Sequence, residues 1–229
     1  MTQHQVAGSL PKIIRNHENR YEGDLRHWFA TVMNHATNLR GPYHNFRHMF
    51  HVTYLCHDAL AWHQQFEPGR ISGHEGRVLM VSAVTHDVDH TNRAGNDDIN
   101  IERATAFLKA HALKEDQLIL PLIIRTIRRA TRYPYVVPSD ELTQIEQILR
   151  DADMSQALDP VWIQEVIFGL GQEFGKSPVA MLQLQEVFLG NVKFSTEWAR
   201  LRFPTEAIDA KRAEARDLLH LAVEPIQTA

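Results

Sequence analysis

The chain has 229 residues, of which 44% are hydrophobic, and it carries a formal net charge of −4. Such a chain can bury a substantial core, and its mild acidity argues against general affinity for nucleic acid polymers or anionic membranes. It contains no apolar run of the about 18 residues that a membrane span needs, and no apolar stretch typical of a signal peptide near its N-terminus. The lone Cys56 cannot form an intramolecular disulfide. We therefore expect a cytoplasmic protein with a single domain over residues 1–229.

Apolar residues recur at three- and four-residue steps along nearly the whole chain, which predicts an all-α fold, a compact bundle of many helices. No alternating run is long enough to suggest a strand, and there is no internal repeat. The expected helices cover residues 22–39, 45–65, 77–88, 99–111, 116–132, about 141–153, 160–174, 178–192 and 205–222.

Local signals set the boundaries of several of these helices. Residues 92–98 read as a polar loop, and residues 133–138 as an extended or turn-like segment because they contain two prolines. Pro121 should start or kink the helix over residues 116–132. Ser139 or Asp140 can cap the helix that follows.

Four arginines fall within eight residues in the helix over residues 116–132. A solvated helix face explains them, and the alternative is a basic rim that attracts a phosphate-bearing substrate. These residues are Arg125, Arg128, Arg129 and Arg132.

Histidines concentrate toward the N-terminus, with all but one of the fourteen in the first 111 residues. His44 and His48 are four residues apart, a spacing that places two side chains on one helix face. That arrangement suits two ligands of one metal centre, or a ligand beside a proton donor. A polar helix surface that happens to be rich in histidine is the alternative.

His86 and Asp87 follow an apolar run over residues 77–85, so a buried helix delivers both of them. A buried imidazole and carboxylate must be paired or must bind a metal, because an uncompensated charge is costly there. A His–Asp hydrogen bond without a metal is the alternative. His90 lies four residues further on and extends the same cluster.

Asp153 is the acidic candidate in the second half of the chain. Asp151 and Asp153 stand at the C-terminal end of an amphipathic helix, where the helix dipole disfavours negative charge. A bound cation would account for them. An exposed pair of aspartates at a helix end is an equally good reading of the spacing.

The segment Tyr43-His44-Asn45-Phe46-Arg47-His48, followed by His86-Asp87-Val88-Asp89-His90, resembles the two hallmark motifs of the class I cyclic nucleotide phosphodiesterases. These enzymes belong to the HD-domain superfamily of metal-dependent phosphohydrolases. Asp151-Ala152-Asp153-Met154-Ser155 resembles their third motif, and the stretch around Glu102 resembles a helix that carries a glutamate near the metals. The resemblance covers about residues 43–158, the metal-site core. Within the C-terminal helices over about 160–222, the stretches over residues 199–207 and 211–216 are similar to small bacterial members of the superfamily, and an amphipathic closing helix that packs on the bundle is the alternative.

The resemblance implies a role for each of these residues. His48, His86, Asp87 and Asp153 would bind the tighter metal, and Asp87 would bridge to a second one. His44 would be the general acid, and His90 and Glu102 would hold metal-bound water or phosphate oxygens. The tight site would take zinc, iron or manganese and the second site magnesium or manganese.

Together these motifs predict a phosphohydrolase in which two metals activate a hydroxide to cleave a phosphoester. A 3',5'-cyclic nucleotide diester is the first expectation for the substrate, and a nucleotide phosphomonoester is the alternative. A non-catalytic regulatory or ligand-binding protein on the same scaffold is the alternative from another class. Only 76 residues follow Asp153 (229 − 153), and no glutamine among Gln172, Gln183 and Gln185 aligns with the one that holds the purine in the phosphodiesterases.

Overall fold

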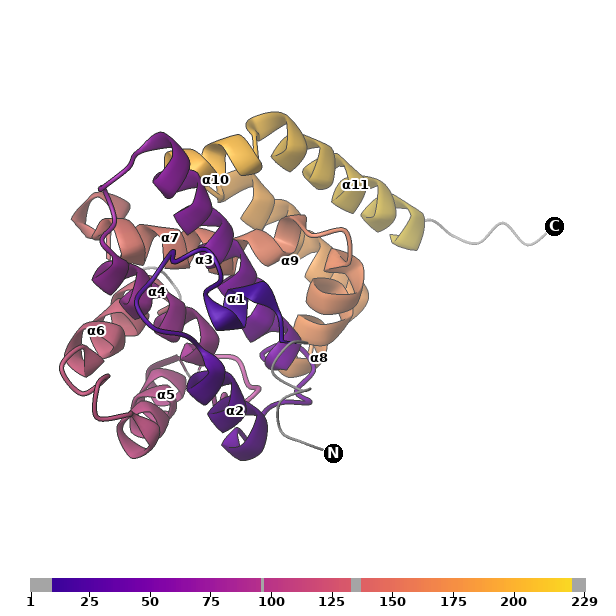
Figure 1. The fold of residues 1–229 in the computed structure, drawn as a ribbon. Helices are drawn as coiled ribbons and strands as arrows, with labels where there is room; N and C mark the ends of the chain where they lie inside the picture. Colours follow the sequence, from indigo (N-terminus) through magenta and orange to yellow (C-terminus); the bar gives the residue numbers. More distant parts are fainter. Residues whose placement is uncertain (1–9, 96, 133–136, 224–229) are drawn as a thin grey trace.

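The computed structural model describes residues 10–95, 97–132 and 137–223 of the chain. Within these ranges the chain forms helices and turns and no strand, which confirms the prediction of an all-α bundle (Figure 1). None of the described helices is both long enough and apolar enough to cross a membrane. The expected segment at 133–138 lies mostly outside the described residues.

The first two thirds of the chain form helices α1 to α7, of which α3 is the longest. They are α1 (Lys12–Arg15), α2 (Arg26–His35), α3 (Phe46–Phe66), α4 (Gly73–Thr85), α5 (Asp97–His111), α6 (Leu120–Ala130) and α7 (Gln144–Met154).

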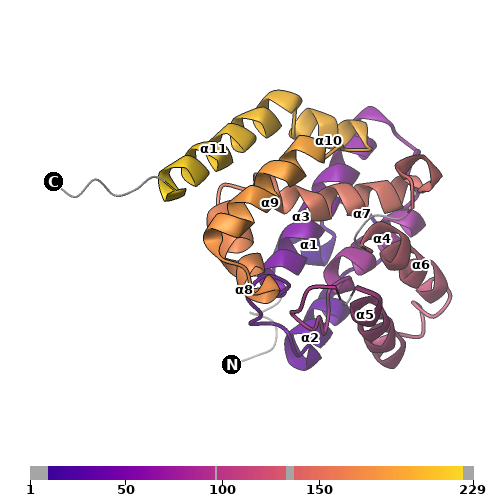
Figure 2. The ribbon, with the colours of Figure 1, turned by 180° about the vertical axis from the view of Figure 1, so that it is seen from behind.

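Shorter and less regular elements separate α7 from the last long helices. They are a 3-10 turn η2 (Ser155–Leu158), a π-helix η3 (Ile163–Leu170), α8 (Gly171–Phe174), α9 (Pro178–Asn191), α10 (Glu197–Arg202) and α11 (Thr205–Val223). In both views α5 and α6 lie at one end of the molecule and α9 and α11 at the other, with α3 and α7 between them (Figures 1 and 2).

Helix α4 is the centre of the main core, since every residue from Gly76 to Thr85 is buried. Its apolar side chains face α2, α3, α6 and α7, which explains why its sequence is apolar on all sides. Cys56 is fully buried on α3 beside it, as a small packed side chain. Because other helices surround α4, the two residues that follow it, His86 and Asp87, are placed in the interior.

A second, smaller core joins the C-terminal elements to the rest. Trp162, Val166, Met181 and Leu182 from η3 and α9 pack with Ala215 of α11. Tyr43 from the loop before α3 also belongs to this cluster. The C-terminal helices are therefore packed against the histidine-bearing loop, and this contact becomes important in the site.

The structure corrects the predicted cap of α7 and decides between the two roles predicted for Pro121. Ser139 opens a separate 3-10 turn, η1 (Ser139–Glu141), and neither Ser139 nor Asp140 caps α7. Thr143 caps α7 instead, in a capping box with Glu146. Pro121 lies in the first turn of α6, so it starts that helix and does not kink it.

A buried ion pair fastens α4 to the segment before α6. The Asp116 carboxylate accepts hydrogen bonds from Arg77 Nε (3.0 Å) and Nη2 (2.9 Å), and from Trp28 Nε1 (2.8 Å). Arg77 also donates to the backbone oxygens of Glu22 and Asp24. Because Arg77 is itself buried, removing the Asp116 carboxylate leaves a buried cation without its ionic partner.

We expect Asp116→Ala to lower the free energy of unfolding by about 3–5 kcal/mol, the usual cost of breaking a buried pair on one side. Urea unfolding followed by circular dichroism measures this. Asp98→Ala, which removes the carboxylate of the exposed Arg132–Asp98 pair, is the matched control and should cost less than about 1 kcal/mol. Equal losses in the two variants would contradict the assignment.

Candidate metal centre

Four side chains from three elements converge beneath the surface. His48 of α3 places its Nε2 3.1 Å from both Asp87 Oδ2 and Asp153 Oδ1. His86 places its Nε2 3.1 Å from Asp87 Oδ2, 3.7 Å from Asp153 Oδ1 and 3.3 Å from His48 Nε2. These four residues, which we call the HHDD cluster, are the four that the sequence predicts as ligands of the tighter metal.

The outer nitrogens of both imidazoles are held by acceptors. His86 Nδ1 lies 2.8 Å from the backbone oxygen of Ala83, and His48 Nδ1 lies 3.4 Å from Gln156 Oε1. An acceptor beside Nδ1 requires a proton on that nitrogen, so Nε2 is the nitrogen that faces the two carboxylates. Metal-ligating histidines in proteins are fixed in this way.

Without a cation, protons must balance the negative charge of the HHDD cluster, and the pKa values of its members reflect this. Burial lowers the pKa of His48, but hydrogen bonds that it donates to Asp153 and Asp87 outweigh burial and raise the pKa to about 9. Burial raises the pKa of Asp153, and the bonds to His48 and His86 outweigh it and lower the pKa to about 2. Two carboxylates therefore hold positive charge between them, either as protons on imidazoles or as a metal ion.

The donor set fits a divalent metal. A cation about 2.1 Å from each of its ligands keeps those ligands about 3.0–3.4 Å from one another. The five contacts that join the two histidines to each other and to the carboxylates, 3.1–3.7 Å long, approach this spacing. Imidazole and carboxylate donors suit zinc, iron and manganese, so His48, His86 and Asp87 could hold a metal ion, with Asp153 beside the two histidines.

The loop before α3 is built differently from the prediction. The chain becomes helical only at Phe46, and Asn45 caps α3 by accepting from the backbone N–H groups of Arg47 and His48. His44 therefore lies in the loop and does not share a helix face with His48. The spacing of four predicts a shared helix face, but α3 begins after its cap at Asn45, so His44 points toward a different partner.

Asn38 joins the two histidine motifs, and the sequence analysis missed it. Its buried amide donates to the backbone oxygens of His44 and Asp87, both at 2.7 Å, and its oxygen accepts from the Asp89 N–H at 2.8 Å. Asp89 sits in the turn after α4 with a φ of 60°. One side chain thus fixes the loop that carries His44 and the turn between Asp87 and His90.

The two aspartates at the end of α7 have separate roles. Asp151 accepts from the backbone N–H groups of Ser195 and Thr196 and from the Thr196 hydroxyl, which caps α10. Asp153 turns to the HHDD cluster. The reading of an exposed pair is therefore wrong, and the C-terminal acidity of α7 is explained by two sets of buried partners.

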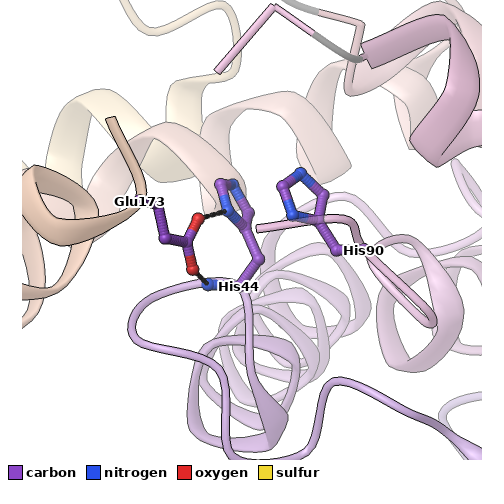
Figure 3. Close-up of side chains that lie close together, drawn as sticks. All are labelled: His44, His90 and Glu173. Carbon is purple, nitrogen blue, oxygen red and sulfur yellow. Dashed lines mark hydrogen bonds and ion pairs between the residues drawn. The ribbon is translucent and has the colours of Figure 1, made fainter. Parts of the chain in front are cut away.

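Beside the HHDD cluster, Glu173 holds His44 (Figure 3). Its Oε2 lies 2.6 Å from His44 Nδ1, and its Oε1 accepts from the backbone N–H groups of His44 (2.9 Å) and Tyr43 (2.7 Å). Burial raises the pKa of Glu173, but the bond from His44 outweighs it and lowers the pKa below its ordinary value. Glu173 is thus a carboxylate that orients an imidazole.

Glu173 reaches His44 because the preceding π-helix packs tightly on the loop. A Cβ at Gly169 of η3 would lie 2.6 Å from the backbone oxygen of Pro42. Only glycine permits this approach of η3 to the loop that carries His44. The sequence offers only a weak signal for Glu173, which is one of two glutamates in the largely apolar stretch over residues 162–174.

His90 lies on the far side of His44, with the two rings stacked at 3.7 Å between centroids (Figure 3). Its Nδ1 accepts from the Asn92 N–H, and its Nε2 lies 2.6 Å from the Asn100 amide nitrogen. Burial and the neighbouring His44 lower the pKa of His90 to about 4. His90 is therefore a neutral imidazole at neutral pH and a poor proton donor.

Glu102 lies away from both groups, contrary to the expectation for it. Its side chain is 65% exposed and pairs with Arg128. Asn100 of the same helix faces the site, and Glu102 comes about 200° further round the helix. The resemblance identified the right helix and the wrong residue.

The arginines in and just after α6 are paired with carboxylates. Arg125 and Arg129 both contact Glu146, and Arg132 pairs with Asp98. With Arg128 on Glu102, each of the four arginines has a carboxylate partner, which favours the solvated helix face over a basic rim.

A cleft of about 910 Å³ opens above the two groups. His86, Asp87 and Asp153 lie on its floor together with His44 and His90, while residues of η3, α8 and α9 form one wall. Of the three glutamines considered from the sequence, Gln185 lines this cleft, whereas Gln172 and Gln183 are exposed. Comparison with protein-family models gives no match, and a search of curated proteins finds no relative.

We expect metal uptake by the HHDD cluster to release protons. Metal needs the bare Nε2 of His48, whose pKa of about 9 keeps that atom protonated at neutral pH without metal. The apparent affinity for Mn²⁺ should therefore rise with pH, about tenfold per unit for each proton displaced, and level off near pH 9. Calorimetry in buffers of different ionisation enthalpy counts these protons. An affinity that is independent of pH from 6 to 9 would contradict the centre.

Proposed function

We propose that the protein is a metal-dependent phosphohydrolase of the HD-domain superfamily, with a 3',5'-cyclic nucleotide diester as the first substrate to test. One observation carries this proposal: histidine and aspartate side chains that could hold a cation line the same cleft as a carboxylate-oriented imidazole. Metal-dependent cleavage of a phosphoester needs charge neutralisation at the phosphoryl group and a proton for the leaving oxygen. The two groups of residues can supply these separately.

The HHDD cluster would hold the tighter cation, with Asp87 shared toward a second one. When bound, the two cations would activate water and neutralise charge on the phosphoryl oxygens. The second group, His44, His90 and Glu173, has the donor atoms for a cation as well. Because Glu173 already accepts three hydrogen bonds and both nitrogens of His90 have partners, we assign this group to proton transfer.

His44 is the residue that donates the proton. The Glu173 carboxylate holds a proton on His44 Nδ1, so Nε2 is the nitrogen that exchanges protons with the leaving oxygen. His90 stacks on the ring and limits its rotation, and since it is neutral it does not compete for the role.

A cytoplasmic location remains our expectation, in keeping with the free thiol of Cys56.

We expect Asp87→Ala to lose metal-dependent hydrolysis while the protein stays folded. Asp87 contacts both histidines of the HHDD cluster, so its removal takes away a ligand and half of the negative charge. Elemental analysis and a panel of cyclic and linear nucleotides measure the two effects together. Turnover equal to that of the wild type in a metal-free variant would refute the proposal.

We expect His44→Ala and Glu173→Gln to retain metal and to slow hydrolysis of esters with poor leaving groups by about 100-fold, the usual contribution of general acid catalysis. Esters of p-nitrophenol, which leave without a proton, should be affected much less. Gln183→Ala, an exposed change outside the site, is the control. Equal slowing of both ester types would assign the two residues to binding and not to proton transfer.

A further inference from the structure

The α9 wall of the cleft presents large apolar side chains to solvent. Leu184 is 44% exposed and Val187 is 63% exposed, and Met181 and Phe188 line the cleft one turn to either side. These positions follow the three- and four-residue steps of a single helix face. Exposed apolar residues scattered over a surface are ordinary, but a row of them inside a cleft marks a place where apolar material binds.

The polar side chains of this wall are engaged with backbone groups. The Gln185 amide donates to the Ala157 oxygen, and the Asn191 amide donates to the Val187 oxygen. Arg150, which also lines the cleft, donates to three backbone oxygens, those of Arg129, Ala130 and Val137. The wall therefore has apolar surface to offer a ligand and few uncommitted donors to bind the edge of a nucleobase.

The wall begins at the metal centre. Ala157, which receives the Gln185 amide, follows Asp153 by four residues, and both line the same cleft. From Gln185 the helix axis runs about 9 Å further to Asn191, the last residue of α9, at the rise of an α-helix. The cleft volume of about 910 Å³ lies near the upper end of the range of about 300–1,000 Å³ for small-molecule sites.

We propose that the substrate is a phosphoester with an extended apolar group, which lies along α9 while its phosphate sits at the HHDD cluster. This inference rests on the proposed function for the position of the phosphate. The floor and the α9 wall belong to one cleft, so an apolar chain attached to a phosphate would fill both parts at once. This favours such a molecule as the substrate. The exposed cations Lys176 and Lys193 lie beyond the two ends of the helix and leave the wall itself uncharged.

The test uses methyl, butyl and octyl esters of p-nitrophenyl phosphate for hydrolysis, and the corresponding alkyl monophosphates for calorimetric binding to the Mn²⁺-loaded protein. Full burial of a methylene is worth about fourfold, so a half-open wall should give about twofold for each one. From methyl to octyl we therefore expect about a 100-fold rise in kcat/KM and in affinity.

Leu184→Asn combined with Val187→Asn should reduce this dependence on chain length to less than about tenfold and leave the methyl compounds unchanged. Leu122→Asn is the matched control, because Leu122 is a leucine of similar exposure, 43%, on a helix that does not line the cleft. It should leave the dependence on chain length intact.

The outcomes separate the two proposals. Binding that rises with chain length, without hydrolysis of any ester, supports the apolar site and overturns the phosphohydrolase. Hydrolysis with a flat dependence on chain length supports the phosphohydrolase and overturns the apolar site. If the double variant instead breaks a dimer seen by sedimentation and leaves the dependence on chain length unchanged, a second copy covers the wall and the inference is wrong.

Discussion

Two carboxylates, 13% and 17% exposed, face two buried imidazole nitrogens, and this pairing is the constraint on which the rest of the site depends. Positive charge between the carboxylates and the histidines is what stabilises the negative charges of Asp87 and Asp153. The outer nitrogens of both rings are already hydrogen-bonded, so the rings cannot turn away from the carboxylates. A centre of this kind is stable as a unit, and the removal of any one member disturbs the other three.

Polar side chains from distant parts of the chain hold the surrounding segments around this centre. Asn38 joins the two histidine-bearing segments, Asp151 fixes the start of α10, and Glu173 reaches His44 across 129 residues of sequence. Each uses buried hydrogen bonds, which are directional and costly to leave unmade. The apolar core could tolerate small shifts, whereas these bonds set the position of the loops.

The sequence predicted the all-α class and brought together the four members of the HHDD cluster, because burial and helical spacing are local signals. It failed where a boundary or a long-range contact decided the outcome. The cap at Asn45 removed His44 from the helix, although the Thr143–Glu146 pattern that caps α7 was readable as a capping box. Asn38 and Glu173 act through contacts that only tertiary packing creates, and Glu102 was placed by resemblance and not by its own surroundings.

The residues of the HHDD cluster lie between positions 48 and 153, whereas the cleft wall and the carboxylate that orients His44 come from positions 166–193. The tight approach of Gly169 to Pro42 couples that later segment to the loop that carries His44. A substitution that reshapes the wall therefore also moves this imidazole. Any change in what the cleft accommodates must keep Glu173 within hydrogen-bonding distance of the loop that it holds.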